Sequence, residues 1–140
     1  MDFHALEISC YLFSIIKINN IAFVTSYEQA VPPKLGFCIL AHVYRGMKNS
    51  QPHDHGPSWA VYSQVAGVTE MTDWRLVQKP QNGQPGKVEK VRTYKLTPGV
   101  AHVYNEGELH SPRRDGDTKL IRIEGRDLTK VKRDKFEIAA

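Results

Sequence analysis

The segment His53-Asp54-His55 sets two imidazoles two residues apart. On an extended strand this spacing puts both side chains on one face. Two ring nitrogens side by side form part of a metal site, and imidazole suits iron, zinc, nickel and copper. The chain has six histidines, so others can complete the site. We therefore expect a metal site that starts at His53 and His55.

His110 and His102 are the two candidates for the third ligand. His110 is followed by turn residues and then by an alternating segment, 119–124, as a hairpin requires. His102 lies inside a brief predicted strand, 101–104, and we interpret it as an ordinary turn or strand histidine. We predict that His53, His55 and His110 are the ligands of one divalent metal ion.

Short strands are the elements that must position these ligands. Turn-forming residues such as those of 81–86 separate the segments with strand character. No convincing amphipathic helix follows residue 30. The predicted strands are 35–44, 58–66, 68–77, 88–96, 101–104 and 119–124. Many short strands with glycine and proline between them predict an all-β sandwich or barrel.

The length of 140 residues suits one domain with a hydrophobic core. We predict a single domain over 31–140 and an N-terminal segment, 1–30, packed on it as a helix or as an irregular leader. The apolar run 5–16 lacks the basic start of a signal peptide and is too short to span a bilayer. We therefore expect no membrane contact.

Charge and cysteine content narrow the setting of the protein. The net charge is +4, and the basic residues near the carboxyl end are interleaved with acids. A nucleic-acid surface needs charges of one sign and aromatic side chains for stacking, so we expect no nucleic-acid partner. The only cysteines, Cys10 and Cys38, do not form a disulfide framework. We expect a cytoplasmic protein.

Two spacing patterns resemble the motifs of the cupin superfamily. The first cupin motif reads G, five residues, H-x-H, three or four residues, E, six residues, G. Here six residues separate Gly46 from His53, and His55 is followed by four residues, Ala60, six residues and Gly67. The resemblance therefore implies that the two histidines are metal ligands.

The second cupin motif reads G, five residues, P-x-G, two residues, H, three residues, N. Gly99, Asn105, Gly107, His110 and Arg114 match every interval of this motif. This agreement favours His110 as the third ligand. The resemblance covers roughly 35–125 and implies a cupin jelly roll, also called a double-stranded β-helix barrel. Because cupins commonly pair, it also implies a homodimer.

Three residues depart from the motifs: Ala60 replaces the glutamate ligand, Asn105 the proline and Arg114 the asparagine. A site of three histidines is neutral, so the ion keeps its charge and open positions for an anionic substrate. In this respect the chain is similar to the cysteine dioxygenase branch of cupins, which uses three histidines and ferrous iron. The resemblance favours Fe(II), with zinc, nickel or manganese as alternatives.

Strand parity predicts which side chains line the pocket. If Ala60 faces the metal, Tyr62 and Gln64 also point inward. Tyr62 either hydrogen-bonds a bound substrate or fills the barrel. Arg122 either binds a substrate carboxylate or is an exposed charge paired with Glu124. We take Tyr62 and Arg122 as the candidate catalytic residues.

Three functions are compatible with these residues. The first is a non-haem iron dioxygenase, an oxidoreductase that acts on a small metal-chelating thiol or an aromatic or enolic anion. The second is a redox-neutral lyase or isomerase in which the metal polarises a carbonyl or hydroxyl group. The third is a non-catalytic cupin that binds a small molecule. We predict an enzyme with a small-molecule substrate.

Overall fold

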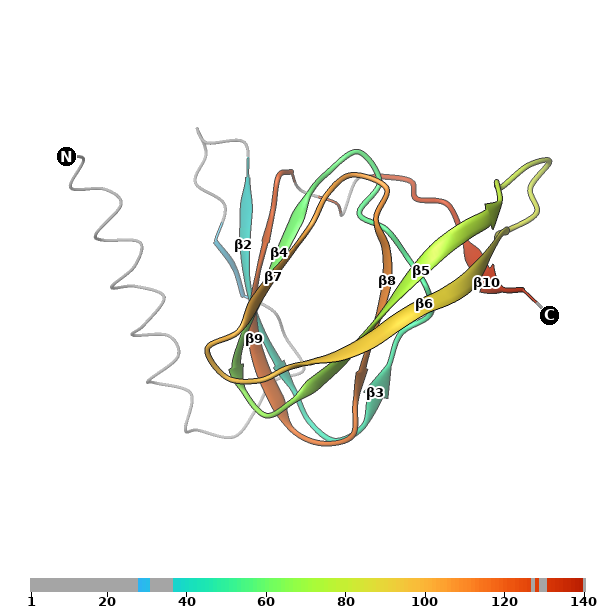
Figure 1. Ribbon diagram of the computed structural model, residues 1–140. Coiled ribbons are helices and arrows are strands. Elements are labelled where there is room, and N and C mark those ends of the chain that lie inside the picture. The colour runs from blue at the N-terminus through green and yellow to red at the C-terminus, as the bar shows by residue number, and fades with distance from the viewer. Residues whose placement is uncertain (1–27, 31–36, 127, 129–130, 140) are drawn as a thin grey trace.

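The computed structural model describes residues 28–30, 37–126, 128 and 131–139. Strands dominate this part of the chain (Figure 1). In chain order they are β1 (Glu28–Ala30), β2 (Cys38–Tyr44), β3 (Lys48–Asn49), β4 (Ala60–Ala66), β5 (Thr69–Gln78), β6 (Gly86–Leu96), β7 (Ala101–Tyr104), β8 (Leu109–Arg114), β9 (Thr118–Glu124) and β10 (Phe136–Ile138).

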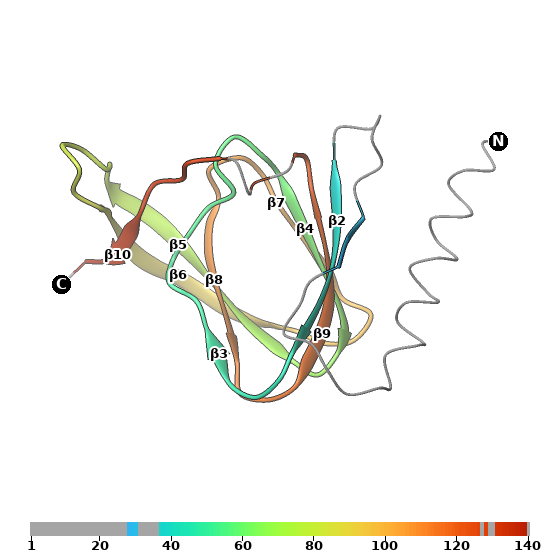
Figure 2. The same ribbon diagram turned by 180° about the vertical axis from the view of Figure 1, so that it is seen from behind.

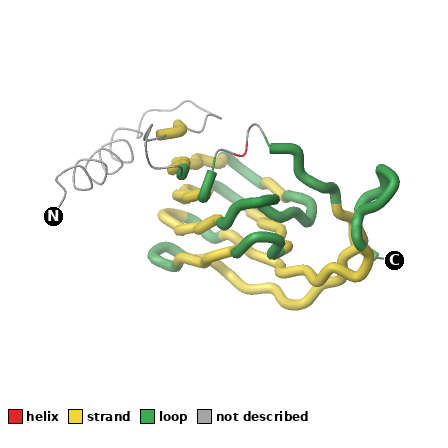
Figure 3. The backbone as a smooth tube through the Cα atoms, turned by 90° about the horizontal axis from the view of Figure 1, so that it is seen from above, coloured by secondary structure: helices red, strands yellow, loops and turns green. Residues whose placement is uncertain are grey.

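The strands form two five-stranded sheets that face each other (Figures 1 and 2). One sheet has the order β1-β2-β9-β4-β7 and lies on the left in Figure 1. The other has the order β10-β6-β5-β8-β3. All neighbouring strands are antiparallel except β10 and β6. The view from above shows both sheets curving around the interior (Figure 3). The prediction of an all-β barrel is confirmed.

Alternating burial shows which face of each strand points inward. In β4, Ala60, Tyr62 and Gln64 are buried while the residues between them are half-buried. The register aligns Ala60 with Glu124 of β9 and Tyr62 with Arg122. These side chains therefore share the inner face of one sheet. The core combines residues of both sheets: Ala60, Tyr62, Met71, Leu96, Tyr104 and Leu120.

Six strands match the predicted segments, β7 at both ends and the other five with at least one shifted end. Four strands were not predicted: β1, β3, β8 and β10. Turn residues were expected directly after His110, but 111–114 continue strand β8. The reason is tertiary, because β8 pairs with β5 on one side and β3 on the other. Such pairing outweighs the local turn preference of this segment.

The predicted N-terminal segment lies outside the described residues except for β1, which pairs with β2. The proposed boundary between 1–30 and 31–140 therefore remains a prediction. Among the described residues, no helix has the length and apolar character needed to cross a membrane.

Candidate metal centre

The three predicted ligands come from two places in the chain. His53 and His55 lie in the segment between β3 and β4, and His110 lies on β8. Two backbone hydrogen bonds join His53 to His110: the amide of each residue donates to the carbonyl of the other, at 3.0 and 2.9 Å. This isolated bridge fixes the His53-Asp54-His55 segment against β8.

The histidines form a compact cluster inside the barrel. Each offers one ring nitrogen, and these ligand atoms all lie within 4.8 Å of one another. The Nε2 atoms of His55 and His110 are 3.3 Å apart. Only 1% of His55 and 0% of His110 is exposed, and His53 is half-buried. Three histidines in this arrangement can hold a metal ion.

Hydrogen bonds at Nδ1 orient all three rings. Nδ1 of His53 lies 2.8 Å from the carbonyl oxygen of Gln51, and Nδ1 of His110 lies 3.3 Å from that of Glu108. Nδ1 of His55 lies 3.1 Å from a carboxylate oxygen of Glu124. Each partner is an acceptor, so the proton belongs on Nδ1 and the lone pair on Nε2. This pattern fits metal ligation through Nε2.

Burial keeps the imidazoles of His53 and His110 neutral. The pKa of His110 is lowered to about 2 and that of His53 to about 4, mainly by desolvation and in smaller part by the neighbouring imidazoles. Because a metal binds the unprotonated ring, little proton competition is expected at neutral pH. The donor set is three imidazoles, which suit iron, zinc and nickel.

A carboxylate from β9 lies beside the position where cupins carry a ligand glutamate. Ala60 is fully buried, and its register partner is Glu124. Glu124 contacts Nδ1 of His55 and therefore supports a ligand. Such a carboxylate–histidine pair orients the ring and makes it a stronger donor.

Tyr62 points toward the histidine cluster from β4. Its hydroxyl lies 3.3 Å from Nε2 of His55, and its ring packs edge-on to those of His55 and His110. Burial raises the pKa of Tyr62, although the charge of Arg122 opposes this effect. The phenol therefore keeps its proton at neutral pH. Tyr62 also belongs to the hydrophobic core. Its position is therefore compatible with both predicted roles, hydrogen bonding to a substrate and filling the barrel.

Arg122 lies on the inner face of β9 and is mostly covered, with 24% of its side chain exposed. Its Nε is 3.0 Å from Oε1 of Glu124, an ion pair without hydrogen-bond geometry. The guanidinium also lies 5.9 Å from the centre of the Tyr62 ring. The predicted pairing with Glu124 is present, but the side chain is largely buried.

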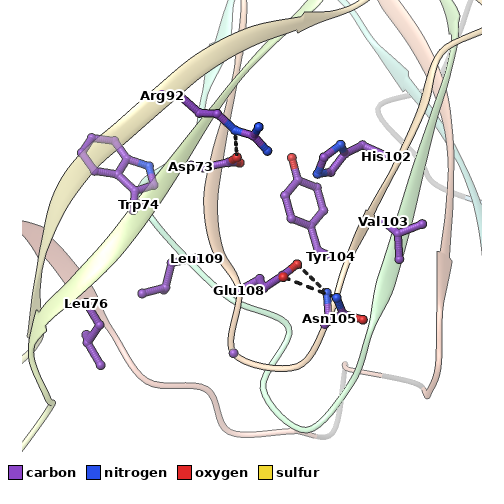
Figure 4. A pocket seen from close by; sticks show the side chains of 11 residues that line it. Asp73, Trp74, Leu76, Arg92, His102, Val103, Tyr104, Asn105, Glu108 and Leu109 are labelled. Atoms are coloured by element: carbon purple, nitrogen blue, oxygen red, sulfur yellow. Dashed lines mark hydrogen bonds and ion pairs between the residues drawn. The ribbon is translucent and has the colours of Figure 1, made fainter.

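A cavity of about 530 Å³ opens beside the cluster. In Figure 4, Asp73 and Arg92 face His102 and Tyr104 across it, and Glu108 contacts Asn105 at its edge. His102 therefore lines this cavity and does not join the three-histidine cluster. The rest of the lining is Trp74, Leu76, Val103, Gly107 and Leu109.

Sequence reasoning missed Tyr104, which separates this cavity from the histidines. Its ring stacks on His110, with centroids 3.7 Å apart. Its hydroxyl is 2.5 Å from that of Tyr94, which donates to Asp73 at 3.2 Å. No motif marks Tyr104. The only sequence signal for Tyr104 was its place in a predicted strand, where alternate side chains point inward. In the structure Tyr104 pairs with the inward-facing Ala60.

Comparisons with known proteins agree with the barrel. No family model matches the sequence, and no curated protein matches it. A cupin-2 domain protein of Shewanella frigidimarina matches in structure with a TM-score of 0.54 at 14% identity, over 79% of this chain and 89% of that chain. A cupin superfamily protein of Desulfitobacterium hafniense gives 0.54 at 12% identity, over 76% and 84%.

The DMSP lyase DddQ of Ruegeria pomeroyi gives a TM-score of 0.50 at 16% identity. That match covers 73% of this chain and 44% of the lyase. Similarity at these identities concerns the fold. The described part of the chain has two facing, mostly antiparallel sheets. Together with that arrangement, these similar structures show that the chain has the cupin fold.

Proposed function

We propose that the protein is a metal-dependent enzyme that binds one divalent ion, with Fe(II) favoured, through His53, His55 and His110. Its preferred reaction is dioxygenation of a small metal-chelating thiol or an aromatic or enolic anion. The observation that supports this proposal is the convergence of three imidazoles with each Nδ1 hydrogen-bonded to an acceptor. Such a donor set leaves the charge of the ion for an anionic substrate.

The chain's own groups have assigned roles in this proposal. Bound iron supplies a substrate-binding position and redox chemistry with O₂. Tyr62 holds a proton near the cluster and donates a hydrogen bond to the substrate. Arg122 supplies positive charge beside Tyr62. Both atoms of O₂ enter the product, so the reaction needs no external reductant.

A redox-neutral lyase or isomerase is the second candidate. The protonated phenol of Tyr62, 3.3 Å from Nε2 of His55, can act as a proton donor without any oxidant. Similarity to a DMSP lyase in the fold is compatible with this alternative. Glu108, a second candidate for proton transfer, accepts hydrogen bonds from Asn105 and has a structural role in its turn.

Metal analysis of the purified protein is the primary test. We expect about one equivalent of iron, its loss in His53→Ala, and its retention in the control variant His102→Ala. Oxygen uptake by the iron-loaded protein with a panel of thiols and catechols then tests the reaction. Turnover without O₂ supports the lyase or isomerase. A full equivalent of metal in His53→Ala contradicts the assigned site, and substrate binding without turnover indicates a non-catalytic cupin.

A further inference from the structure

The ring of Tyr104 lies flat against that of His110 inside the barrel. The two ring centroids are 3.7 Å apart, and the ring planes differ by 16°. Only 2% of Tyr104 and 0% of His110 is exposed. The last torsion of a histidine side chain has a broad energy minimum, so neighbouring groups must fix the plane of the ring. The parallel Tyr104 ring is such a group.

His110 has more need of this contact than the other two histidines of the cluster. Its Nδ1 is 3.3 Å from the carbonyl oxygen of Glu108, whereas the corresponding separations are 2.8 Å for His53 and 3.1 Å for His55. Hydrogen bonds between a nitrogen and an oxygen rarely exceed about 3.2 Å, so the Glu108 carbonyl alone orients the His110 ring weakly. The stack with Tyr104 supplies the constraint that this bond lacks.

A chain of hydrogen bonds holds Tyr104 in place. Its hydroxyl is 2.5 Å from that of Tyr94, which donates to Oδ1 of Asp73 at 3.2 Å. A carboxylate only accepts and each phenol has one proton, so Tyr104 donates to Tyr94 and Tyr94 donates to Asp73. Oδ2 of Asp73 accepts from Nε of Arg92 at 2.7 Å (Figure 4). The chain therefore runs without a break from a buried ring to the exposed Arg92.

Strand pairing places both ends of this chain beside His110. Tyr104 lies on β7, at the edge of one sheet, whereas Tyr94 on β6 and Asp73 on β5 belong to the other sheet. The register aligns Asp73 with His110 of β8. Next to Asp73 the register between β5 and β6 shifts and passes over Val91. Such an irregularity re-aims neighbouring side chains, and bulges of this kind are frequent beside functional sites.

Tyr104 and Tyr62 contact the histidine cluster in different ways. The hydroxyl of Tyr62 is 3.3 Å from Nε2 of His55. The hydroxyl of Tyr104 is bonded to Tyr94, so Tyr104 contacts His110 through its ring. Tyr104 therefore acts on the cluster through the orientation of a ligand.

We propose that Tyr104 is a positioning residue whose ring holds His110 in the orientation for metal ligation through Nε2. Tyr94 and Asp73 hold the Tyr104 ring in that place through its hydroxyl. Ring stacking and a continuous set of hydrogen bonds thus restrict the same side chain. The role of His110 as a ligand rests on the proposed function, whereas the stack and the hydrogen bonds need no ion.

The first test uses metal-free protein and proton NMR. The ring current of a stacked tyrosine moves the carbon-bound protons of the neighbouring imidazole upfield. The His110 ring protons, assigned by their absence in His110→Gln, should show this upfield shift in the wild type. Tyr104→Leu should lose the shift, and Tyr104→Phe should keep it because the ring remains. Unchanged His110 resonances in Tyr104→Leu overturn the proposal.

The second test is the binding of cobalt(II), whose visible absorption reports coordination geometry. Tyr104→Leu should weaken binding by about 10–100-fold, the range expected when a group that orients a ligand is removed, and should alter the absorption bands. Tyr44→Leu is the matched control, because Tyr44 packs against the same core and stacks on His42, a histidine outside the cluster. The control should keep the wild-type affinity and spectrum. Wild-type affinity in Tyr104→Leu, or an equal loss in Tyr44→Leu, overturns the proposal.

Phenylalanine variants test the hydrogen-bonded chain and keep the proposal testable if Tyr104→Leu does not fold. Tyr94→Phe and Tyr104→Phe both remove the bond between the two hydroxyls and retain the rings. Each should weaken cobalt(II) binding by about two- to tenfold, since one hydrogen bond contributes that much. The double variant should match the single variants, because the same bond is lost in all three. Additive losses, or no loss in either single variant, contradict the chain.

These measurements separate the positioning role from the proposed function. A wild type that binds no metal but shows the upfield His110 shift overturns the proposed function and supports the hold of Tyr104 on His110. A wild type that binds one equivalent of metal, with unchanged affinity in Tyr104→Leu, overturns the positioning role and leaves the metal-dependent function intact.

Discussion

At the scale of single residues, His55 shows how the barrel prepares a ligand. Its ring is buried, its Nδ1 faces the carboxylate of Glu124, and its Nε2 faces His110 and Tyr62. The carboxylate fixes both the orientation of the ring and the nitrogen that carries the proton. Ala60, the register partner of Glu124, has no ligand atom where the cupin motif has a glutamate. Glu124 therefore acts on the site through His55.

Glu124→Ala is therefore expected to weaken metal binding by about 10–100-fold without removing any ligand. Glu124→Gln should have a smaller effect, because its amide oxygen can still accept the proton of His55 Nδ1. Zinc or cobalt(II) affinity, measured by competition with a chelating dye, gives the comparison. Glu89→Gln is a control, since Glu89 is an exposed residue of β6 paired with Arg75. Unchanged affinity in Glu124→Ala would contradict the supporting role.

At the scale of elements, the turn between β4 and β5 requires a glycine. Gly67 has a φ of +70°, a conformation that other residues rarely adopt. A Cβ added there would lie 2.3 Å from the carbonyl oxygen of Asp117 and 2.9 Å from Cγ2 of Thr118. The turn therefore packs directly against the start of β9, and the last glycine of the first cupin-like motif has a steric role.

Gly67→Ala should lower the free energy of unfolding by at least about 2 kcal/mol, since backbone strain and a clash with main-chain atoms act together. Urea denaturation measures the loss. Gly116→Ala is the matched control, because Gly116 precedes Asp117, has no positive φ and has open space around its Cα. The control should stay within about 0.5 kcal/mol of wild type. Equal free energies of unfolding for the two variants would contradict the steric role of Gly67, because the turn would then accommodate the added methyl group without strain.

The sequence predicted those features that depend on local pattern. Alternation and turn residues predicted six strands, and motif spacing predicted that His53, His55 and His110 would converge. The roles of Glu124, Tyr104 and Arg114 depend on which strands pair and in which register. Register comes from contacts between distant parts of the chain, which no local pattern encodes. The departure from the motif at Arg114 was visible, but its burial against the ring of Tyr44 required the barrel.

At the scale of the whole molecule, the histidine cluster lies where the chain crosses between the sheets. His110 belongs to β8 in one sheet, and the segment with His53 and His55 connects β3 of that sheet to β4 of the other. Two backbone hydrogen bonds already join this segment to β8. An ion held by all three rings would strengthen that connection in the folded state alone, so metal affinity and barrel stability are coupled.

Metal binding should therefore raise Tm. At a free metal concentration 100 times Kd the gain is about 2.7 kcal/mol, or roughly 5–10 °C for a chain of this size. Scanning calorimetry with and without zinc measures the shift, and a chelator should reverse it. His110→Ala should lose the shift, whereas His102→Ala, which alters another inward histidine, should keep it. A Tm that does not respond to metal in the wild type, or responds equally in His110→Ala, would place any bound ion away from the three histidines.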